Sequence, residues 1–394
     1  MPFFPLYVLA LGGSYYHIGI IATIGAFFQV IGSFFGGYLA DYVGRKRMIY
    51  SMSFLNSLDA ILFLISPSWE YLILASAFNA LFSGLEDPSV TAIIADSTSL
   101  ETRTKGFTAN QVLRILAGSV SPIIVGILMV NSGIIIAQRI AYACGFVTSM
   151  IASLMRFLWL EETLSKKSES SYTVKGVFLD TILSFKNTIK AMPYQVWVII
   201  ATGAIFTSGV SIGASFFVTY AVEDVIKLSA SEWGMIYAVM SILNVITMIL
   251  VATLSDKFGR LKLIIPAMFF TPFCIMAFVY SSNLIHVLVV MSILSILGGM
   301  IASPIKALLF DYSPKEHRGR VQALSNIISP LPEGNILYQG PTQSVINGVS
   351  SIFGGLTYGF SNTLPFYIES VIIGVSAIFG AFMIKESKQN EKKL

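Results

Sequence analysis

Charged residues are scarce in this sequence. Lys, Arg, Asp and Glu make up 12% of its 394 residues, about half of the roughly 25% that a typical soluble domain carries. So little charge cannot solvate the surface of a globular chain of this length. The composition therefore excludes a soluble enzyme, a disordered chain and a nucleic-acid-binding protein.

Cysteine is also nearly absent. Cys144 and Cys274 each lie in a long apolar run, so neither a disulfide framework nor a thiolate metal site is indicated. A phosphate-binding loop with Gly-Lys-Ser/Thr is missing as well, which excludes direct use of ATP. We expect no enzymatic chemistry, no cofactor and no metal.

Apolar residues are abundant and make up 55% of the chain. About 20 of them in a row cross a bilayer core as a helix. The runs of this order are continuous rather than alternating, which favours membrane helices over the strands of a membrane barrel. They lie near 18–40, 48–66, 70–95, 107–130, 137–160, 193–221, 233–254, 263–281, 284–310, 345–360 and 364–384.

A shorter apolar stretch, from Pro2 to Leu11, precedes these eleven runs. As a helix it would be about 15 Å long, half of a bilayer core. It lacks the basic segment and the cleavage site of a signal peptide, so we interpret it as the second half of a membrane helix whose first half is missing. The expected fold class is an all-α polytopic membrane protein with twelve helices in two six-helix bundles.

The basic residues are sorted to one side of these predicted helices. Twenty of the 25 Lys and Arg residues fall in alternate loops and in the C-terminal tail. The opposite loops hold only Lys227, among acids such as Glu70 and Asp224. By the positive-inside rule, both termini lie in the cytoplasm and the chain is a multi-pass protein of the cell membrane.

The two halves of the sequence repeat each other at an offset of 215 residues. Asp41-x-x-Gly44-Arg45 returns as Asp256-x-x-Gly259-Arg260. The repeat predicts bundles at 1–160 and 191–384, a cytoplasmic linker at 161–190 and a tail at 385–394. Parallel repeats of this kind place a site between the halves at the membrane midplane, which favours a transporter.

The segment Gly37-Tyr-Leu-Ala-Asp41-Tyr-Val-Gly44-Arg45-Lys46 resembles the signature loop between the second and third helices of the major facilitator superfamily. Its second copy stands between the eighth and ninth helices, where that family repeats it. Tyr42 and Ala252 depart from the pattern. The resemblance implies a monomeric carrier of a small-molecule substrate that works by alternating access, with protons as the expected coupling ion.

In that family the loop is a cytoplasmic latch; the alternative is a basic loop that only fixes orientation. A tight turn there needs the backbone freedom of glycine, and the aspartate can pair with the nearby arginine or cap a helix N-terminus. A second set of repeated charges is expected to complete each latch. The latch residues are Gly37, Asp41, Gly44, Arg45, Lys46, Asp256, Gly259 and Arg260, together with Asp96, Glu101, Arg103, Asp311, Glu316 and Arg318.

Ionisable groups inside a membrane are costly and are candidates for function. Glu86 and Asp87 would lie about 14 Å, and Arg114 about 12 Å, from the cytoplasmic ends of neighbouring helices. We therefore expect Arg114 to pair with Glu86 or Asp87, either as a proton- or anion-binding cluster or as a structural salt bridge. Asp59 is a weaker coupling candidate and is expected to bond a neighbour inside the bundle. Four further charges near helix ends are expected to snorkel to water: Glu369, Arg139, Arg156 and Lys306.

The family's helix arrangement also implies which residues line the cavity, with ordinary helix packing as the alternative. These are Tyr7, Gln29, Asn79, Phe82, Phe206, Ser211, Tyr237 and Asn244. The Gly32-x3-Gly36 spacing indicates a close approach of two helices. About 15 extra residues at 329–343 form either a discontinuous helix or a cytoplasmic loop.

The predicted function is secondary transport of a small solute, coupled to protons. A sensor or scaffold on the same fold, an uncoupled facilitator and a channel are the alternatives. Drug export stays open, because Gly118, Pro122 and Gly126 only partly match the fifth-helix motif of drug exporters. The basic residue that those exporters carry in the fourth helix is absent.

Overall fold

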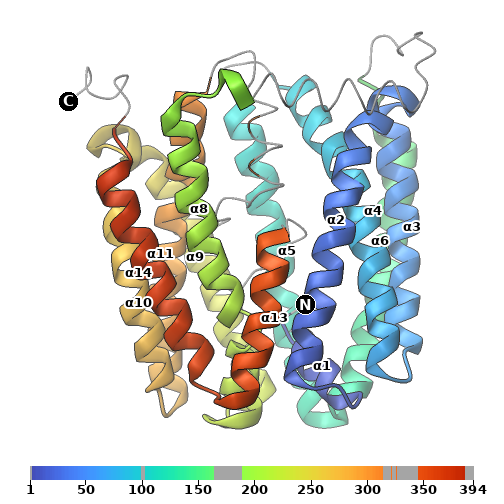
Figure 1. The fold of residues 1–394 in the computed structure, drawn as a ribbon. Helices are drawn as coiled ribbons and strands as arrows, with labels where there is room; N and C mark the ends of the chain where they lie inside the picture. The colour runs from blue at the N-terminus through green and yellow to red at the C-terminus, as the bar shows by residue number, and fades with distance from the viewer. Residues whose placement is uncertain are drawn as a thin grey trace.

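The structure, a computed structural model, describes residues 2–98, 103–163, 189–313, 321, 325 and 345–386. Its elements in these ranges are helices, which confirms the all-α prediction (Figure 1). They are α1 (Phe4–Ala10), α2 (Tyr15–Val43), α3 (Arg45–Ile65), α4 (Trp69–Asp96), α5 (Arg103–Ser132), α6 (Ile134–Trp159), α8 (Tyr194–Gly213), η1 (Thr219–Asp224), α9 (Ala230–Phe258), α10 (Leu261–Val279), α11 (Leu284–Tyr312), α13 (Val345–Phe360) and α14 (Leu364–Met383).

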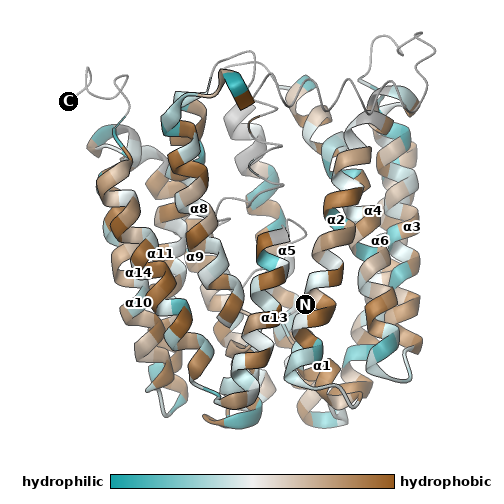
Figure 2. Cartoon of the chain, viewed as in Figure 1, coloured by the Kyte–Doolittle hydropathy of each residue, from teal (hydrophilic) through white to brown (hydrophobic). Residues whose placement is uncertain are grey.

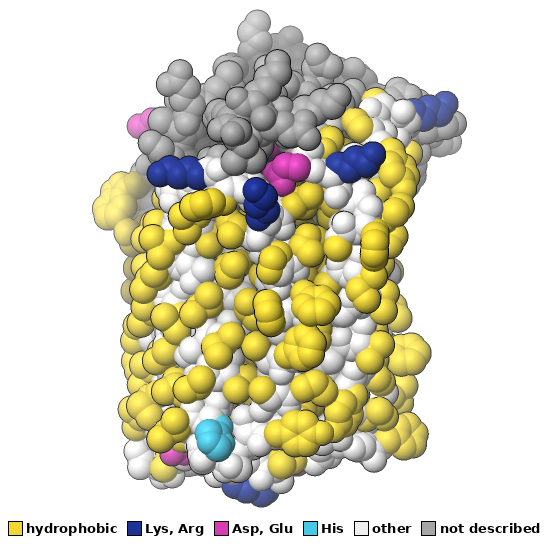
Figure 3. Space-filling model, turned by 90° about the vertical axis from the view of Figure 1, so that its left-hand side faces the viewer, with side chains coloured by type: hydrophobic (Ala, Val, Ile, Leu, Met, Phe, Trp, Pro, Cys, Tyr) yellow, Lys and Arg dark blue, Asp and Glu magenta, His cyan; other side chains and the backbone are white. Residues whose placement is uncertain are grey.

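Nine of the described helices are long and apolar enough to cross a membrane. Three further helices do not meet that criterion. Helix α4 contains three acidic residues within its apolar run, Glu70, Glu86 and Asp87, while α13 has 16 residues and α1 has seven. Together they are consistent with the expected twelve. Large apolar side chains are exposed along the helices, which Figure 2 shows by hydropathy. On the face drawn in Figure 3, these side chains form a belt, and most of the visible Lys and Arg lie at one rim.

The sequence repeat is also a structural repeat. Helix α9 begins and ends 215 residues after α2, and each is followed by a glycine with positive φ, Gly44 at 107° and Gly259 at 93°. These φ values lie in the region that glycine adopts without steric cost. The predicted role of glycine in both loops is thereby confirmed. We call the end of the molecule that carries these loops the basic end.

The helices form a first bundle (α1–α6) and a second bundle (α8–α14). In the first bundle α2 lies directly on α4, because glycines face the partner backbone: a Cβ on Gly32 would lie 2.4 Å from the Leu81 carbonyl oxygen, and one on Gly84 would lie 2.5 Å from the Gln29 carbonyl oxygen. Close approach at small residues is how membrane helices gain packing energy. The predicted role of the Gly32 stripe is confirmed.

The two bundles meet along two helix pairs, α2 with α13 and α5 with α9. Glycine again allows backbone contact: a Cβ would lie 2.4 Å from a partner carbonyl oxygen at Gly19 and at Gly126, and at 2.6 Å at Gly355. The partner residues are Ser351, Ala230 and Tyr15. Because α2 and α9 begin there and α5 and α13 end there, these contacts lie toward the end of the molecule opposite the basic end.

One predicted helix is interrupted. The apolar run at 193–221 gives α8, which ends at Gly213, then a turn, then the π-helix η1. Single π-turns are frequent at functional sites. The extra segment 329–343 lies outside the described residues, and α13 begins after it, at Val345.

The α2–α4 contact generates a stability prediction. Gly32→Ala should lower the midpoint temperature of thermal unfolding, because the new Cβ forces two backbones apart at a cost of about 1–3 kcal/mol. The matched control is Gly118→Ala in α5, where a Cβ would meet nothing within 4 Å. There the higher helix propensity of alanine should leave stability unchanged or raise it by up to about 1 kcal/mol. Equal effects of the two substitutions in a fluorescence melting assay would contradict the close approach.

Candidate functional site

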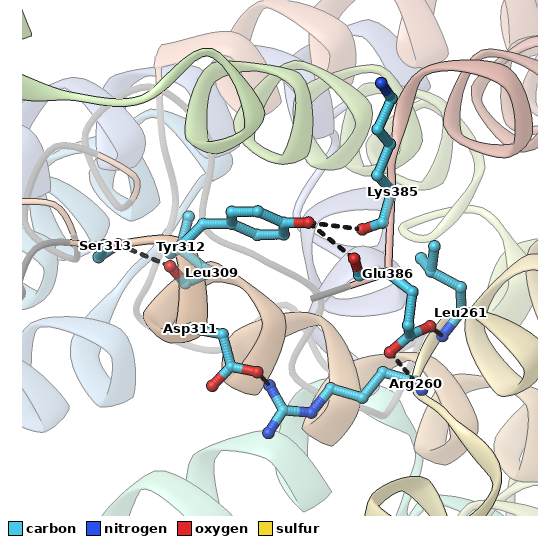
Figure 4. A network of polar contacts seen from close by, with 8 residues as sticks. All are labelled: Arg260, Leu261, Leu309, Asp311, Tyr312, Ser313, Lys385 and Glu386. Atoms are coloured by element: carbon cyan, nitrogen blue, oxygen red, sulfur yellow. Dashed lines mark hydrogen bonds and ion pairs between the residues drawn. The ribbon is translucent and has the colours of Figure 1, made fainter. Parts of the chain in front are cut away.

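Two equivalent ion pairs stand at the basic end. Arg45 at the start of α3 pairs with Asp96 at the end of α4, and Arg260 before α10 pairs with Asp311 near the end of α11 (Figure 4). Both partners of each pair are related by the 215-residue repeat. Each arginine ties two helices of its own bundle together.

A carboxylate that sequence reasoning missed completes each of these latches. Glu162 accepts hydrogen bonds from the backbone N–H groups of Arg45 and Lys46, both at 3.2 Å. Glu386 accepts from Arg260 and Leu261, both at 3.0 Å (Figure 4). Each caps a helix N-terminus, where backbone N–H groups lack partners and negative charge is favoured. A glutamate just after the last apolar run of each half is the signal that could have identified them.

Arg45 pairs with Asp96, and the expectation that Asp41 pairs with Arg45 or caps a helix falls on a side chain outside the described residues. Gly37 faces α4, where a Cβ would lie 4.0 Å from Pro88. The remaining predicted latch side chains lie outside the described part of the structure: Asp41, Asp256, Glu101, Arg103, Glu316 and Arg318.

The buried acid of α4 has a different partner from the one predicted. Oε1 of Glu86 lies 2.6 Å from Nη1 of Arg156 in α6, and Arg156 also donates to Ser53 of α3. Arg114 is exposed and interacts with Glu86 only at longer range. The predicted Arg114–Glu86 pair is therefore wrong, because α4 packs mainly on α2 and α3 and much less on α5.

Two charges expected to snorkel are instead bonded inside the first bundle. Arg156 pairs with Glu86, as described, and Arg139 donates from Nη2 to the carbonyl oxygen of Ser66 at 3.1 Å, at the end of α3. A third, Glu369 of α14, is fully buried. The length of a side chain and its distance from a helix end did not reveal which neighbouring helix covers it.

A polar cluster joins α3 and α4 at the level of Asp59. The buried Asp59 accepts a hydrogen bond from Nδ2 of Asn79 at 2.5 Å, and Asn56 donates to Ser83 at 3.0 Å. The expectation that Asp59 bonds a neighbour inside the bundle is met.

The described residues hold no group of three His, Cys, Asp or Glu side chains that could bind a metal.

Most of the predicted cavity residues are packed between helices in this conformation. Tyr7 is fully buried and donates to the carbonyl oxygen of Phe63 at 3.0 Å, and Asn244 donates to that of Ser295 at 3.1 Å. Buried as well are Gln29, Phe206, Ser211 and Tyr237, whereas Phe82 is half-buried and Asn79 is exposed. Their role in substrate binding stays a prediction.

Opposite the basic end, one carboxylate links the two bundles. Asp224, the last residue of η1, accepts a hydrogen bond from the hydroxyl of Tyr15 and another from that of Tyr358, each at 2.7 Å. Tyr15 belongs to the first bundle and Tyr358 to the second, and their rings lie 4.7 Å apart. Bonds to a charged acceptor are stronger than neutral ones. We call this set the tyrosine link; the sequence marked Asp224 only as an acid of the opposite loops.

The sequence and the fold resemble known transporters. The model of the Major Facilitator Superfamily matches residues 1–332. The quinolone resistance protein NorA of Staphylococcus aureus is 31% identical over 107 residues, which span 27% of this chain and 28% of NorA. An MFS-type transporter of Methanocaldococcus jannaschii is 22% identical over 326 residues, 82% of this chain and 81% of that protein.

Two solved structures show the same fold. The inward open xylose transporter XylE from E. coli has a TM-score of 0.69 at 16% identity, covering 96% of this chain and 89% of XylE. A POT family transporter in complex with 5-aminolevulinic acid has a TM-score of 0.74 at 12% identity, covering 97% and 92%.

The tyrosine link generates a prediction about opening. Tyr15→Phe removes one hydrogen bond to a carboxylate, which is worth about 1–2 kcal/mol, so the bundles should part about five- to thirtyfold more often at this end. The readout is the rate at which a maleimide labels Ala230→Cys, a position buried against α5, in a Cys144→Ser, Cys274→Ser background. Tyr16→Phe, at the exposed neighbouring tyrosine, is the control and should leave the rate unchanged. Equal rates for both variants would show that the link does not hold the bundles together.

Proposed function

Because the chain belongs to the major facilitator superfamily, we propose that it is a secondary active transporter that moves a small solute across the cell membrane by alternating access. That it is a membrane transporter follows from the family. The coupling to protons and the alternation between two conformations are the parts proposed here.

The observation that carries the proposal is the way the two bundles touch. They meet through the tyrosine link and through glycine contacts toward one end, while each latch at the basic end stays within one bundle. Such an arrangement supports two bodies that rock about their interface. Breaking the tyrosine link would open one side, and bringing the latched ends together would close the other.

We propose that the basic end is cytoplasmic, because cytoplasmic loops carry the excess of Lys and Arg. The C-terminus and the linker at 161–190 then lie inside the cell, and the tyrosine link faces outside. The domain division proposed for the chain is 1–160 and 191–384, since most packing between described helices lies within each range, although α5 and α13 pack mainly on α9 and α2 of the other range. We propose a monomer as the working unit, because both halves of the repeat are present in one chain.

For proton coupling we propose the Glu86 region. Glu86 and Asp59 are buried acids at membrane depth, and charges there are retained for function more often than for stability. Arg114 is exposed and within electrostatic range of Glu86, so it can compete with Arg156 for that carboxylate as the bundles move. Asp87 stays in the proposal as a neighbour of Glu86.

A more specific candidate is export of antibiotics. It is favoured by the similarity to NorA, whose name states quinolone resistance. Pro122 and Gly126, which partly match the motif of drug exporters, lie in the α5–α9 contact between the bundles. A quinolone therefore belongs in the first panel of solutes to be tested.

The test of the proposed function is solute movement in liposomes. Full-length protein is reconstituted, ligands are selected from a solute panel by thermal stabilisation, and uptake of each is measured with and without an imposed pH gradient. A proton-coupled transporter should accumulate a stabilising solute only with the gradient. Equal equilibration without a gradient would identify a facilitator, and no movement of any stabilising ligand would favour a sensor.

The coupling proposal predicts the behaviour of Arg114→Gln. Removing the charge should abolish gradient-driven accumulation, because Arg156 is then the one cationic partner of Glu86 among the described residues. Arg114→Lys should keep part of the accumulation. Arg47→Gln, at an exposed arginine of the basic end, is the control and should transport normally. Normal accumulation by Arg114→Gln would show that Arg114 takes no part in coupling.

A further inference from the structure

Glu369 is the most unusual ionisable group in the described structure. It is the sixth residue of α14, about 8 Å inside that helix from its first residue. Its side chain is 0% exposed, and neither Oε1 nor Oε2 has a hydrogen-bond partner among the described residues. Glu86 and Asp59, by contrast, are also buried but each has a bonded partner.

The surroundings of Glu369 offer nothing to compensate a negative charge. Against α14 pack α8, α10 and α13, and α8 carries no Asp, Glu, Lys, Arg or His from Tyr194 to Gly213. The one charged residue of α10 is Lys262, at its opposite end. The titratable groups of this region are Cys274 of α10, Tyr358 of α13, Tyr367 of α14 itself, and Tyr220, Glu223 and Asp224 of η1.

None of these groups forms a hydrogen bond with the carboxyl group of Glu369. Tyr220 donates to the carbonyl oxygen of Val279 at 2.9 Å, Tyr358 donates to Asp224, and Tyr367 bonds Tyr280. Glu223 is exposed. The neighbour of Glu369 one turn earlier, Phe366, packs into an aromatic cluster with Phe217, Tyr220 and Phe278. An ionised carboxylate in this apolar setting would be uncompensated, which is the costliest way to bury a polar group.

The carboxyl also touches the point where α8 breaks. A Cβ on Gly213, the last residue of α8, would lie 1.9 Å from Oε2 of Glu369, so a side chain at this position would displace the carboxyl group. The chain then turns and enters η1, which ends at Asp224 of the tyrosine link. Glu369 therefore contacts the start of the segment from Gly213 to Asp224, and the tyrosine link is formed at its end.

We propose that Glu369 is a proton-binding site that stabilises the conformation closed at the outer side. The acid can be buried beside Gly213 only as the neutral, protonated carboxyl. When the bundles part and the α8–η1 segment moves, water reaches Glu369 and the proton can leave. Protonation from outside then favours closure, because a ligand shifts an equilibrium toward the state that binds it. The inference rests on the proposed function, since it uses the two states of an alternating-access carrier.

The test is a distance measurement across the outer side at varied pH. Spin labels are placed at Asn131→Cys in α5 and Ser282→Cys before α11, both exposed, in the Cys144→Ser, Cys274→Ser background in lipid nanodiscs. From about pH 5 to about pH 9, a range well beyond the ordinary pKa of glutamate, the ratio of open to closed distances should rise. Release of one proton can change this open-to-closed ratio by at most about tenfold per pH unit.

Glu369→Gln should remove this pH dependence and leave the outer side closed at all pH values. Glu369→Met is a second neutral variant of similar size, in case the amide prevents folding. Glu70→Gln, at an acid of the outer side in the first bundle, is the control and should keep the wild-type slope. An unchanged slope in a folded neutral variant of Glu369, or no pH dependence in the wild type, would overturn the proposal.

A further variant separates this inference from the proposed function. Asp224→Asn weakens the tyrosine link and should increase the open population at every pH. If it does so while Glu369 has no effect on the slope, alternating access stands and only the proton site is wrong. If no open population appears in any variant at any pH, both the proton site and alternating access are contradicted.

Discussion

The structure depends on the need to hold apolar helices together in a medium that is itself apolar. Lipid tails compete with Leu and Ile for every side-chain contact, so association relies on close backbone packing and on bonded polar groups. Glycine supplies the first at Gly32 and Gly84 within the first bundle and at Gly126 between the bundles. Polar pairs such as Glu86–Arg156 and Asp59–Asn79 supply the second. The large apolar residues, by contrast, are exposed in great number and form the surface that meets lipid.

Duplication explains how these few interactions organise a long chain. The Arg45–Asp96 and Arg260–Asp311 pairs, with their capping glutamates, fasten the third, fourth and sixth helices of each half in the same way. Among the described residues, these latch contacts at the basic end stay within each half. In the described part of the chain, the contacts between the halves lie toward the opposite end, where they are made by backbone approach and by hydrogen bonds from tyrosine hydroxyls to Asp224.

Most helix positions, the structural repeat and the role of the glycines could be predicted from the sequence, because apolar length and backbone freedom are local properties. Helix α2 begins at Tyr15 and α9 at Ala230, the repeat's own spacing. Partners across helices were not predictable in this way. Arg156 was assigned to water and Arg114 to Glu86, since residue counting gives the depth of a side chain but not the direction in which it points around the helix. The prediction that Glu369 reaches water was wrong for a related reason. Glu369 lies close to its helix end along the sequence, and only the fold shows that α8 covers it.

What the two halves do not share is as informative as what they do. The repeat aligns η1 with α1, and the position of Asp224 corresponds to Leu9, so α1 has no carboxylate at the position equivalent to the tyrosine link. The tyrosine link is therefore asymmetric, because a carboxylate of the second half accepts a hydrogen bond from a tyrosine of the first. A contact needed only for stability would be expected twice in a duplicated scaffold, as both latches are. The tyrosine link therefore has no counterpart in α1, a difference that the proposed movement of the bundles accounts for and stability alone does not.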